Sequence, residues 1–224
     1  MTDSRIIVAI DSYNYKNSVA LLDALNPELC MVKIGSVAFN SLGRDFVELT
    51  YDRGFKIFLD LKLHDIPNTV RESIKGLISL PIQMLTIHAS GGLQMMKAAM
   101  EAVQGTNIKV FGVTALTSLS DKDTNDIYKR DVVELVNSML DLIEAAGLDG
   151  VVCSPHELVS VTRRDSLLSI TPGIRLIKTN DDQDRIMTAK QAIDLGADYL
   201  VIGRPITTSG DVKKSLNEIY QSIQ

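Results

Sequence analysis

The sequence has few of the residues that mark disulfide-rich or metal-binding proteins. It contains two cysteines and three histidines in 224 residues. Cys30 and Cys153 both lie in apolar segments and form no CxxC or Cys/His spacing, so we interpret them as small buried hydrophobic residues. His64, His88 and His156 form no set typical of metal ligands. The sequence therefore predicts neither a structural metal nor a disulfide.

An excess of positive charge and long apolar runs are also missing. The formal net charge is −5, which argues against a general basic field for nucleic acid or anionic lipid. The apolar run near the N-terminus, residues 6–10, is too short for the core of a signal peptide or for a membrane span. We therefore expect a soluble, cytoplasmic protein that binds neither nucleic acid nor membranes. Any anionic ligand must be recognised by local groups.

The sequence does contain a regular alternation of β-rich and helix-patterned segments. Hydrophobic residues make up 45% of the chain, enough for one sizeable core. Eight β-rich segments lie at 6–11, 29–35, 56–63, 82–88, 108–114, 148–153, 167–173 and 198–203. Helical spacing of apolar residues follows each of them, with the last three helices expected within 156–164, 183–196 and 210–223. The alternation predicts a (β/α)₈ TIM barrel that forms a single domain over residues 1–224, with an open doubly wound sheet as the alternative.

Polar residues concentrate at the carboxyl ends of the predicted strands, which is where such a barrel forms its active site. These residues are Asp11, Lys33, Asp60, Lys62, His88, Thr114, Thr117, the segment TPGIR (171–175) and the segment GRP (203–205). Two polar stretches that break the pattern, 118–131 and 175–183, also follow strands. We expect both stretches at the catalytic rim of the barrel.

The third predicted strand carries charges where an apolar strand would be buried, because it runs into DLKLHDIPNTV (60–70). Side chains alternate between the two faces of a strand. One face is wholly apolar and suits packing under helices: Ile57, Leu59, Leu61 and Leu63. Phe58, Asp60 and Lys62 lie on the other face, which points into the barrel. Burying an ion costs several kcal/mol, roughly, so we interpret Asp60 and Lys62 as lining a cavity rather than as a purely structural ion pair.

Several nearby residues have two interpretations. Thr69 opens the sequence TVRE and is either the N-cap of a helix that starts there or a ligand-binding group. Asp65 belongs to the loop before that helix. Asp11 either ends its strand as a loop cap or binds a ligand, and His88 more simply supports the barrel mouth by hydrogen bonding.

The eighth strand ends in a candidate phosphate site. Gly203 lets a ligand approach the backbone, and Arg204 offers a guanidinium fork. Loops after the seventh and eighth strands are the usual phosphate site of this barrel. Arg175 and Gln183 complete a predicted phosphate clamp opposite the charged third strand.

The order of these motifs resembles the orotidine monophosphate decarboxylase family over the whole chain. The matching segments are VAID (8–11), VKIG (32–35), DLKLHDIPNTV (60–70), HASGG (88–92), VTALTS (113–118), TPGIR (171–175), DDQDR (181–185) and GADYLVIGRPIT (196–207). The resemblance implies conversion of orotidine 5'-monophosphate to uridine 5'-monophosphate, the last step of de novo UMP synthesis. It also implies that the reaction needs no metal and no organic cofactor.

The resemblance further implies a role for each site residue. The catalytic residues would be Lys33, Asp60, Lys62 and Asp65, with Lys62 as the proton donor. The protein would be a homodimer, in which Asp65 and Thr69 complete the partner's site. The substrate would be bound by Asp11, Lys33, Asp60, Ile66, Thr69, Thr117, Pro172, Arg175, Gln183, Gly203 and Arg204. Within that set, Asp11 and Lys33 would hold the ribose, Thr117 the pyrimidine region, and Arg175, Gln183, Gly203 and Arg204 the phosphate.

Two other functions are compatible with the same scaffold. Related barrels such as 3-keto-gulonate-phosphate decarboxylase and hexulose-phosphate synthase share an Asp-x-Lys-x-x-Asp strand but need magnesium, which Lys33 would repel. A non-catalytic nucleotide-binding protein is the second alternative. Simple binding gains nothing obvious from the inward charges of Lys33, Asp60 and Lys62.

Overall fold

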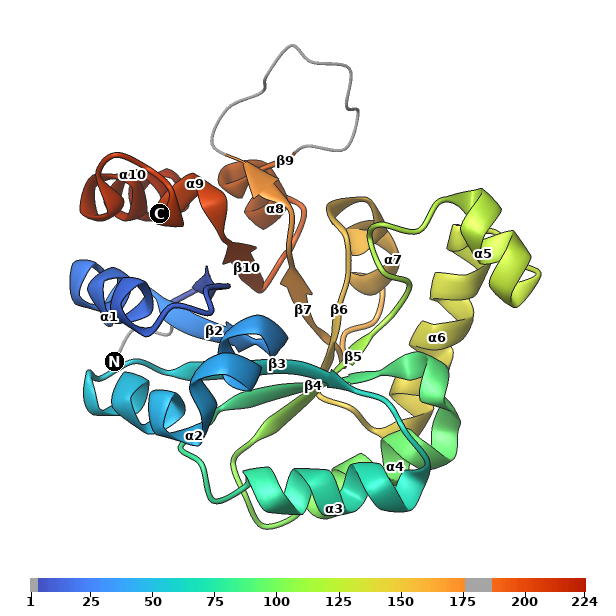
Figure 1. Ribbon diagram of the computed structural model, residues 1–224. Helices are drawn as coiled ribbons and strands as arrows, with labels where there is room; N and C mark the ends of the chain where they lie inside the picture. Colours follow the sequence, from blue (N-terminus) through green and yellow to red (C-terminus); the bar gives the residue numbers. More distant parts are fainter. Residues whose placement is uncertain (1–3, 176–186) are drawn as a thin grey trace.

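The protein folds as a closed barrel of eight parallel strands (Figure 1). The computed structural model describes residues 4–175 and 187–224. The strands of the barrel are β1 (Ile6–Ile10), β2 (Met31–Gly35), β3 (Ile57–Leu63), β4 (Met84–His88), β5 (Lys109–Val113), β6 (Gly150–Val152), β7 (Leu168–Thr171) and β10 (Tyr199–Ile202). Their order around the barrel is β1-β10-β7-β6-β5-β4-β3-β2. The closed order confirms the predicted barrel and rules out the open sheet.

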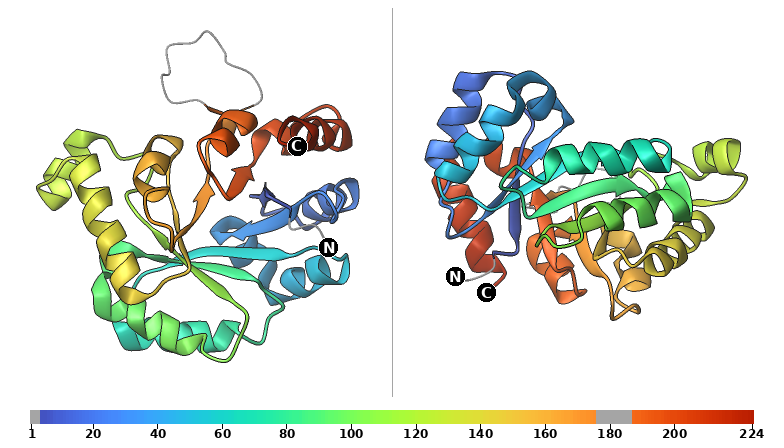
Figure 2. Two further views of the ribbon diagram at one scale, coloured as in Figure 1. Left: turned by 180° about the vertical axis from the view of Figure 1, so that it is seen from behind. Right: turned by 90° about the horizontal axis from the view of Figure 1, so that it is seen from below.

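Helices surround the barrel on its outer side, as the two further views make clear (Figure 2). The main ones are α1 (Tyr15–Ala24), α2 (Ser36–Asp52), α3 (Pro67–Leu77), α4 (Gly92–Ala102), α6 (Val132–Ala146), α8 (Ala189–Asp194) and α10 (Val212–Ser222). The shorter ones are η1 (Ala89–Gly91), η2 (Pro155–Glu157), α7 (Leu158–Val161) and α9 (Arg204–Thr207). Helices α3 and α4 pack side by side over β3 and β4, and α1 lies beside α10.

Two apolar clusters separate the inside of the barrel from its helical coat. The inner cluster contains Phe58 and Phe111, whose ring centroids are 6.4 Å apart in an edge-to-face arrangement. The outer cluster joins the other faces of the strands to the helices and includes Ile57 and Leu59, with Leu61 packed against it. The predicted alternation of faces along β3 is therefore correct. Cys30 and Cys153 are buried, as predicted.

Several predicted boundaries were wrong. The polar stretch 118–131 contains a helix, α5 (Asp121–Tyr128), which a capping box between Ser120 and Asp123 stabilises at its start. The helix expected within 156–164 is reduced to the short η2 and α7. In the helix expected within 183–196, the described part begins only at α8, after the short strand β9 (Met187–Thr188), which pairs with β8 (Ile174–Arg175).

Of the two interpretations of Thr69, the one in which it caps a helix was wrong. Helix α3 begins at Pro67, and its N-cap is Ile66, which makes no side-chain capping bond. Proline fits the first helical position because its φ is already helical and it has no N–H that needs a partner. The proline therefore starts the helix two residues before Thr69, which lies exposed in the first turn.

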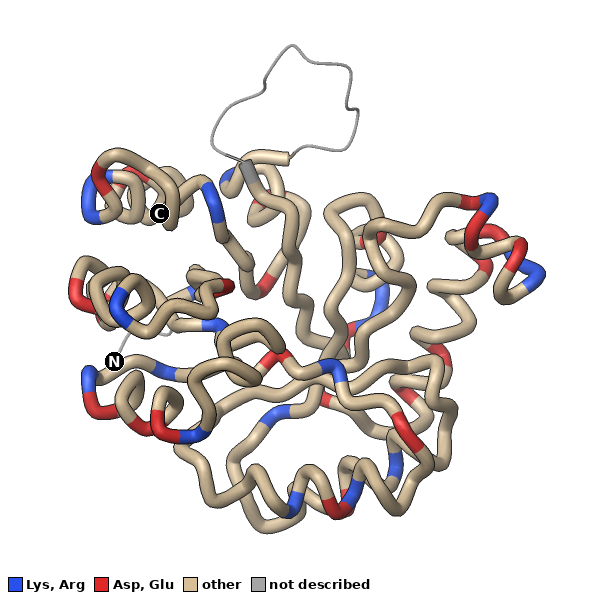
Figure 3. Tube along the Cα trace, viewed as in Figure 1, with Lys and Arg blue, Asp and Glu red and all other residues tan. Residues whose placement is uncertain are grey.

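Charges of both signs are interleaved along the outer helices, including α3, α5 and α10 (Figure 3). This distribution agrees with the modest net charge of −5. None of the helices among the described residues combines the length and the apolar character needed to cross a membrane.

Candidate active site

Three charged side chains from neighbouring strands meet at the carboxyl ends of β2 and β3. The Asp60 carboxylate is at the centre, because its Oδ2 lies 2.7 Å from the Lys62 Nζ and 3.4 Å from the Lys33 Nζ. Lys33 also reaches the Asp11 carboxylate, with 3.1 Å between Nζ and Oδ1. The structure thus brings together four of the predicted site residues in one continuous cluster, which we call the charged array: Asp11, Lys33, Asp60 and Lys62.

Exposure differs strongly within the charged array. The side chains of Asp60 and Lys33 are 8% and 11% exposed, whereas that of Lys62 is 34% exposed. Burial alone would raise the pKa of Asp60, but the charges of Lys33 and Lys62 and the hydrogen bonds from Lys62 and Thr86 outweigh it. The pKa of Asp60 therefore lies below its usual value, and Asp60 is a carboxylate at neutral pH. Lys62 is the cation that reaches toward the mouth of the barrel.

The backbone at Lys62 is irregular in a way that the sequence did not predict. Leu59 pairs with Leu85 and Leu63 with Ile87, so β3 bulges against β4 between these pairs. Lys62 has a φ of 51°, and Lys129 is the other non-glycine residue of positive φ in the described chain. Such a conformation costs about 1–3 kcal/mol for a residue with a Cβ. The surrounding structure must therefore hold Lys62 in place.

Gly35, the last residue of β2, leaves the space in which Lys33 meets Asp11. A Cβ added at Gly35 would lie 2.9 Å from the Lys33 Nζ and 3.2 Å from an Asp11 carboxylate oxygen. The φ of Gly35 is −91°, which any residue adopts, so a side chain at this position would act by displacing the ends of Lys33 and Asp11 rather than by straining the backbone.

Asp65, Ile66 and Thr69 follow β3 on the surface of the chain. All three are exposed, and Ile66 is 66% exposed. The Asp65 carboxylate accepts a hydrogen bond from the backbone N–H of Ile66, at 2.7 Å. The ion pairs found within residues 4–175 and 187–224 do not include Asp65. These residues form an exposed surface just after β3.

The predicted phosphate side lies next to the charged array around the barrel. Strand β10 pairs with β1, and β1 pairs with β2, so Gly203 and Arg204 follow the strand beside the one that leads to Asp11. Arg204 is the exposed first residue of α9. Arg175 ends β8, and nothing further is described for its side chain. Gln183 lies outside the described residues.

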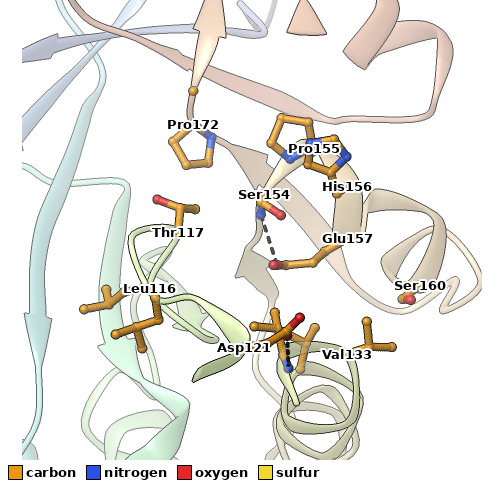
Figure 4. Close-up of a pocket in the computed structure, with 14 residues that line it drawn as sticks. Leu116, Thr117, Asp121, Val133, Ser154, Pro155, His156, Glu157, Ser160 and Pro172 are labelled. Atoms are coloured by element: carbon orange, nitrogen blue, oxygen red, sulfur yellow. Dashed lines mark hydrogen bonds between the residues drawn. The ribbon is translucent and has the colours of Figure 1, made fainter. Parts of the chain in front are cut away.

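A hollow lies beyond the ends of β5, β6 and β7, with a volume of about 450 Å³ (Figure 4). Thr117 and Pro172, two predicted substrate-binding residues, form one wall, and His156 and Glu157 form part of another. Burial raises the pKa of Glu157, against hydrogen bonds from Ser154 and Thr114. Sequence reasoning missed Glu157, although its place three residues after Ser154 is a capping-box signal.

A pair of histidines borders the charged array on the β4 side. The rings of His64 and His88 are 5.4 Å apart between centroids. Burial, followed by the nearby His64 and Lys62, lowers the pKa of His88 below its usual value, so its imidazole is neutral at pH 7. The sequence did not predict this contact, because His64 follows β3 whereas His88 ends β4.

A parallel barrel with a buried lysine and a buried carboxylate, Lys33 and Asp60, near the carboxyl ends of its strands is the architecture of a (β/α)₈-barrel enzyme. Comparisons with known proteins identify which group of such enzymes. A family model described as "Orotidine 5'-phosphate decarboxylase / HUMPS family" matches residues 4–219.

Relatives and solved structures agree with this match. The chain is 43% identical to orotidine 5'-phosphate decarboxylase of Saccharophagus degradans, over 97% of this chain and 94% of that protein. It is also 43% identical to the enzyme of the same name from Coxiella burnetii, over 99% and 98% of the two chains. A crystal structure of orotidine 5'-phosphate decarboxylase from Lactobacillus acidophilus is similar, with a TM-score of 0.88 and 36% identity over 99% of this chain and all of that one. The chain therefore belongs to the orotidine 5'-phosphate decarboxylase / HUMPS family, which confirms the predicted family membership and the prediction that it is an enzyme.

Proposed function

We propose that the protein decarboxylates orotidine 5'-monophosphate to uridine 5'-monophosphate, the last step of de novo UMP synthesis, without a metal or organic cofactor. The observation that carries the proposal is the charged array, in which one buried carboxylate holds two lysines at 2.7 and 3.4 Å. The relatives named for this activity support it.

The reaction needs a positive charge where a carbanion forms. When the bond between the ring carbon and the carboxylate breaks, carbon dioxide leaves and the electron pair stays on a carbon that has no adjacent π system to absorb it. We infer that the Lys62 ammonium stabilises this electron pair and then donates a proton to it, which leaves Lys62 as a neutral amine. A proton from solvent restores the ammonium.

The rest of the charged array keeps Lys62 ready for this step. One charge pair at about 4 Å and an effective dielectric constant near 20 contributes about 4 kcal/mol, which is too little for a very slow reaction. The remainder must come from preorganisation, in which the ionised Asp60 fixes the ammonium before the substrate arrives. Asp11 and Lys33 would bind the ribose, and Asp60 would contact the substrate beside the reacting carbon.

The contacts remote from the reacting carbon would orient the substrate. Thr117 and Pro172 border the hollow beyond the ends of β5, β6 and β7 and would contact the pyrimidine. Gly203 and Arg204, together with Arg175 and Gln183, would hold the phosphate. Binding energy from the phosphate would then help to orient the ring over Lys62.

We further propose a homodimer in which the exposed residues Asp65 and Thr69 complete the partner's site. Asp65 makes an ion pair with no lysine of its own chain within the described residues. A second carboxylate from the partner would complete the set of charges around Lys62. Ile66, which follows Asp65 and is 66% exposed, would contact the substrate.

A magnesium-dependent reaction, as expected for related barrels, fits this site less well. The Oδ2 of Asp60 already accepts from Lys62, and Lys33 lies 3.4 Å away. A divalent cation bound there would have to displace or repel two ammonium groups.

The direct test is to incubate the purified protein with orotidine monophosphate, with and without a chelator, and to follow the ultraviolet change to uridine monophosphate. We expect chelator-resistant turnover that falls roughly 10²–10⁴-fold or more in Lys62→Ala. Lys129→Ala is the matched control, because Lys129 has a φ of 58° like that of Lys62 but caps the end of α5. Near-normal turnover by Lys62→Ala, or turnover that requires metal, would overturn the proposal.

A further inference from the structure

Thr86 joins the backbone and the side chains of the charged array through one hydroxyl group. It lies in the middle of β4 and is fully buried, at 0% exposure. Its hydroxyl donates a hydrogen bond to the Asp60 Oδ1, at 2.9 Å. The same oxygen accepts a hydrogen bond from the backbone N–H of Lys62, also at 2.9 Å. Thr86 thus contacts both residues that the proposed proton transfer depends on.

The bulge in β3 explains why these two contacts are needed. Between the pairs Leu59–Leu85 and Leu63–Ile87, residues 60–62 of β3 face Thr86 alone on β4. The regular ladder cannot pair every backbone group across such a mismatch, and an unpaired buried N–H is costly. The Thr86 hydroxyl takes the place of a backbone carbonyl as the partner of the Lys62 N–H.

The hydroxyl also has a fixed direction. Because its oxygen accepts from Lys62, its own proton is free to point at Asp60. The Asp60 carboxylate is then held at Oδ1 by Thr86 and at Oδ2 by Lys62. Two bonds on opposite oxygens restrict rotation of the carboxylate, and with it the place of the ammonium.

A buried threonine elsewhere in the chain behaves differently. Thr50 in α2 is equally buried, but its hydroxyl donates to the Phe46 carbonyl of its own helix, at 2.7 Å. That bond serves local structure and touches no charged group. Thr86 instead makes both of its side-chain hydrogen bonds to residues of the charged array on the neighbouring strand β3.

From this geometry we propose that Thr86 is a positioning residue, whose hydroxyl holds Lys62 in its left-handed backbone conformation and orients the Asp60 carboxylate for proton transfer. The inference rests on the proposed decarboxylase function. Since Thr86 is fully buried, it does not contact the substrate. Its loss should lower the rate of the chemical step and leave substrate binding almost unchanged.

Thr86→Val tests this proposal because it keeps the β-branched shape and removes the hydroxyl. We expect kcat to fall about 10- to 100-fold, as for a small misplacement of a catalytic group, with KM changed less than about twofold. Thr86→Ser keeps the hydroxyl and should restore kcat to within a few-fold of the wild type. Thr50→Val is the matched control and should lower the unfolding midpoint without changing kcat. If Thr86→Val does not fold, Thr86→Ala takes its place with the same expected result.

Structures of the variants separate this proposal from the proposed function. In Thr86→Val we expect the Lys62 φ to leave its value near 51° or the contact of 2.7 Å between Lys62 and Asp60 to lengthen. If the wild type fails to turn over orotidine monophosphate, the function is wrong, and this structural comparison still decides the role of Thr86. An unchanged array in Thr86→Val, or a kcat equal to that of the wild type, would overturn it, as would a serine variant no more active than the valine variant.

Discussion

Carboxylates at the two ends of the barrel are held by different partners. At the amino ends of the strands, Asp149 accepts from the backbone N–H of Val110 and Asp198 from that of Ser169, each at 2.8 Å. At the carboxyl ends, Asp60 is held by two lysines and a hydroxyl. Asp149 and Asp198 complete the hydrogen bonding of backbone groups at strand ends. Asp60 instead places a negative charge beside the partly exposed Lys62. The same residue type is thus structural at one end and, as we propose, catalytic at the other.

The largest expected effect comes from neutralising Asp60, the carboxylate at the carboxyl ends of the strands. Asp60→Asn removes the negative charge that Lys33 and Lys62 share and leaves two neighbouring cations to repel each other. We expect decarboxylation of orotidine monophosphate to fall by roughly 10³-fold or more, because the ammonium is no longer preorganised. Steady-state kinetics on the purified variant measure this effect.

Asp198→Ala is the matched change at the opposite end. It leaves the N–H of Ser169 without its partner and should lower the free energy of unfolding by about 1–3 kcal/mol, with kcat unchanged. A loss of activity in Asp198→Ala equal to that in Asp60→Asn would erase the distinction between the two ends.

Gly35→Ala should have an intermediate effect. The new Cβ would meet the Lys33 Nζ at 2.9 Å and so displace one cation of the array without altering any charge. We expect kcat/KM to fall about tenfold, equivalent to about 1.4 kcal/mol. Gly76→Ala is a suitable control, because a Cβ at Gly76 in α3 would meet nothing within 4 Å. Full activity of Gly35→Ala would mean that Lys33 can move without cost to the reaction.

The pH dependence of stability should reveal the lowered pKa of Asp60. A carboxyl whose folded pKa is below its unfolded value binds fewer protons in the folded state, so its contribution to stability is complete above the unfolded value of about 3.9. That contribution should be lost only as the pH falls through the folded pKa. Urea unfolding of the wild type and Asp60→Asn should therefore give a constant difference from about pH 7 to 5 and a shrinking one below about pH 4. If the stability difference already shrinks between about pH 7 and about pH 5, the lowered pKa of Asp60 is contradicted.

The smallest expected effect concerns the two buried cysteines, whose thiols should be equally unreactive at the two ends of the barrel. Cys30 precedes β2 at the amino ends of the strands, and Cys153 follows β6 at the carboxyl ends. Burial raises the pKa of each thiol to about 12. Neither should react with a thiol reagent at pH 8 until the protein is unfolded in denaturant. Rapid labelling of Cys153 but not of Cys30 in the native protein would show that the carboxyl-end side of the barrel opens more readily than the amino-end side.

The sequence predicted the barrel and most of the charged array because both follow from short periodic patterns. The period of two along β3 correctly assigned Phe58 and Asp60 to the inner face. It could not predict the left-handed backbone of Lys62, which depends on the register with β4. Thr86 was missed for the same reason, although a polar residue between Met84 and His88 on an inward face was a usable signal.

The errors at helix starts have local causes. Helix α5 is polar throughout and gave no apolar period, yet Ser120 and Asp123 formed a readable capping signal. At α3, the sequence TVRE offered Thr69 as one possible N-cap, whereas Pro67 sets the actual start of the helix. The predicted contact of Asp65 with a partner subunit depends on a second chain, and a single chain's sequence carries only its exposure as a hint.

The order of strands around the barrel also bears on how the chain is made. Strand β10, near the end of the described chain, lies between β1 and β7. Until β10 has been synthesised, the first strand keeps an open edge, which is the kind of surface that pairs with other chains. On the ribosome, the proposed phosphate residues Gly203 and Arg204 join Asp11 and Lys33 only when that edge closes. A nascent chain interrupted before residue 199 would therefore be both inactive and prone to aggregate.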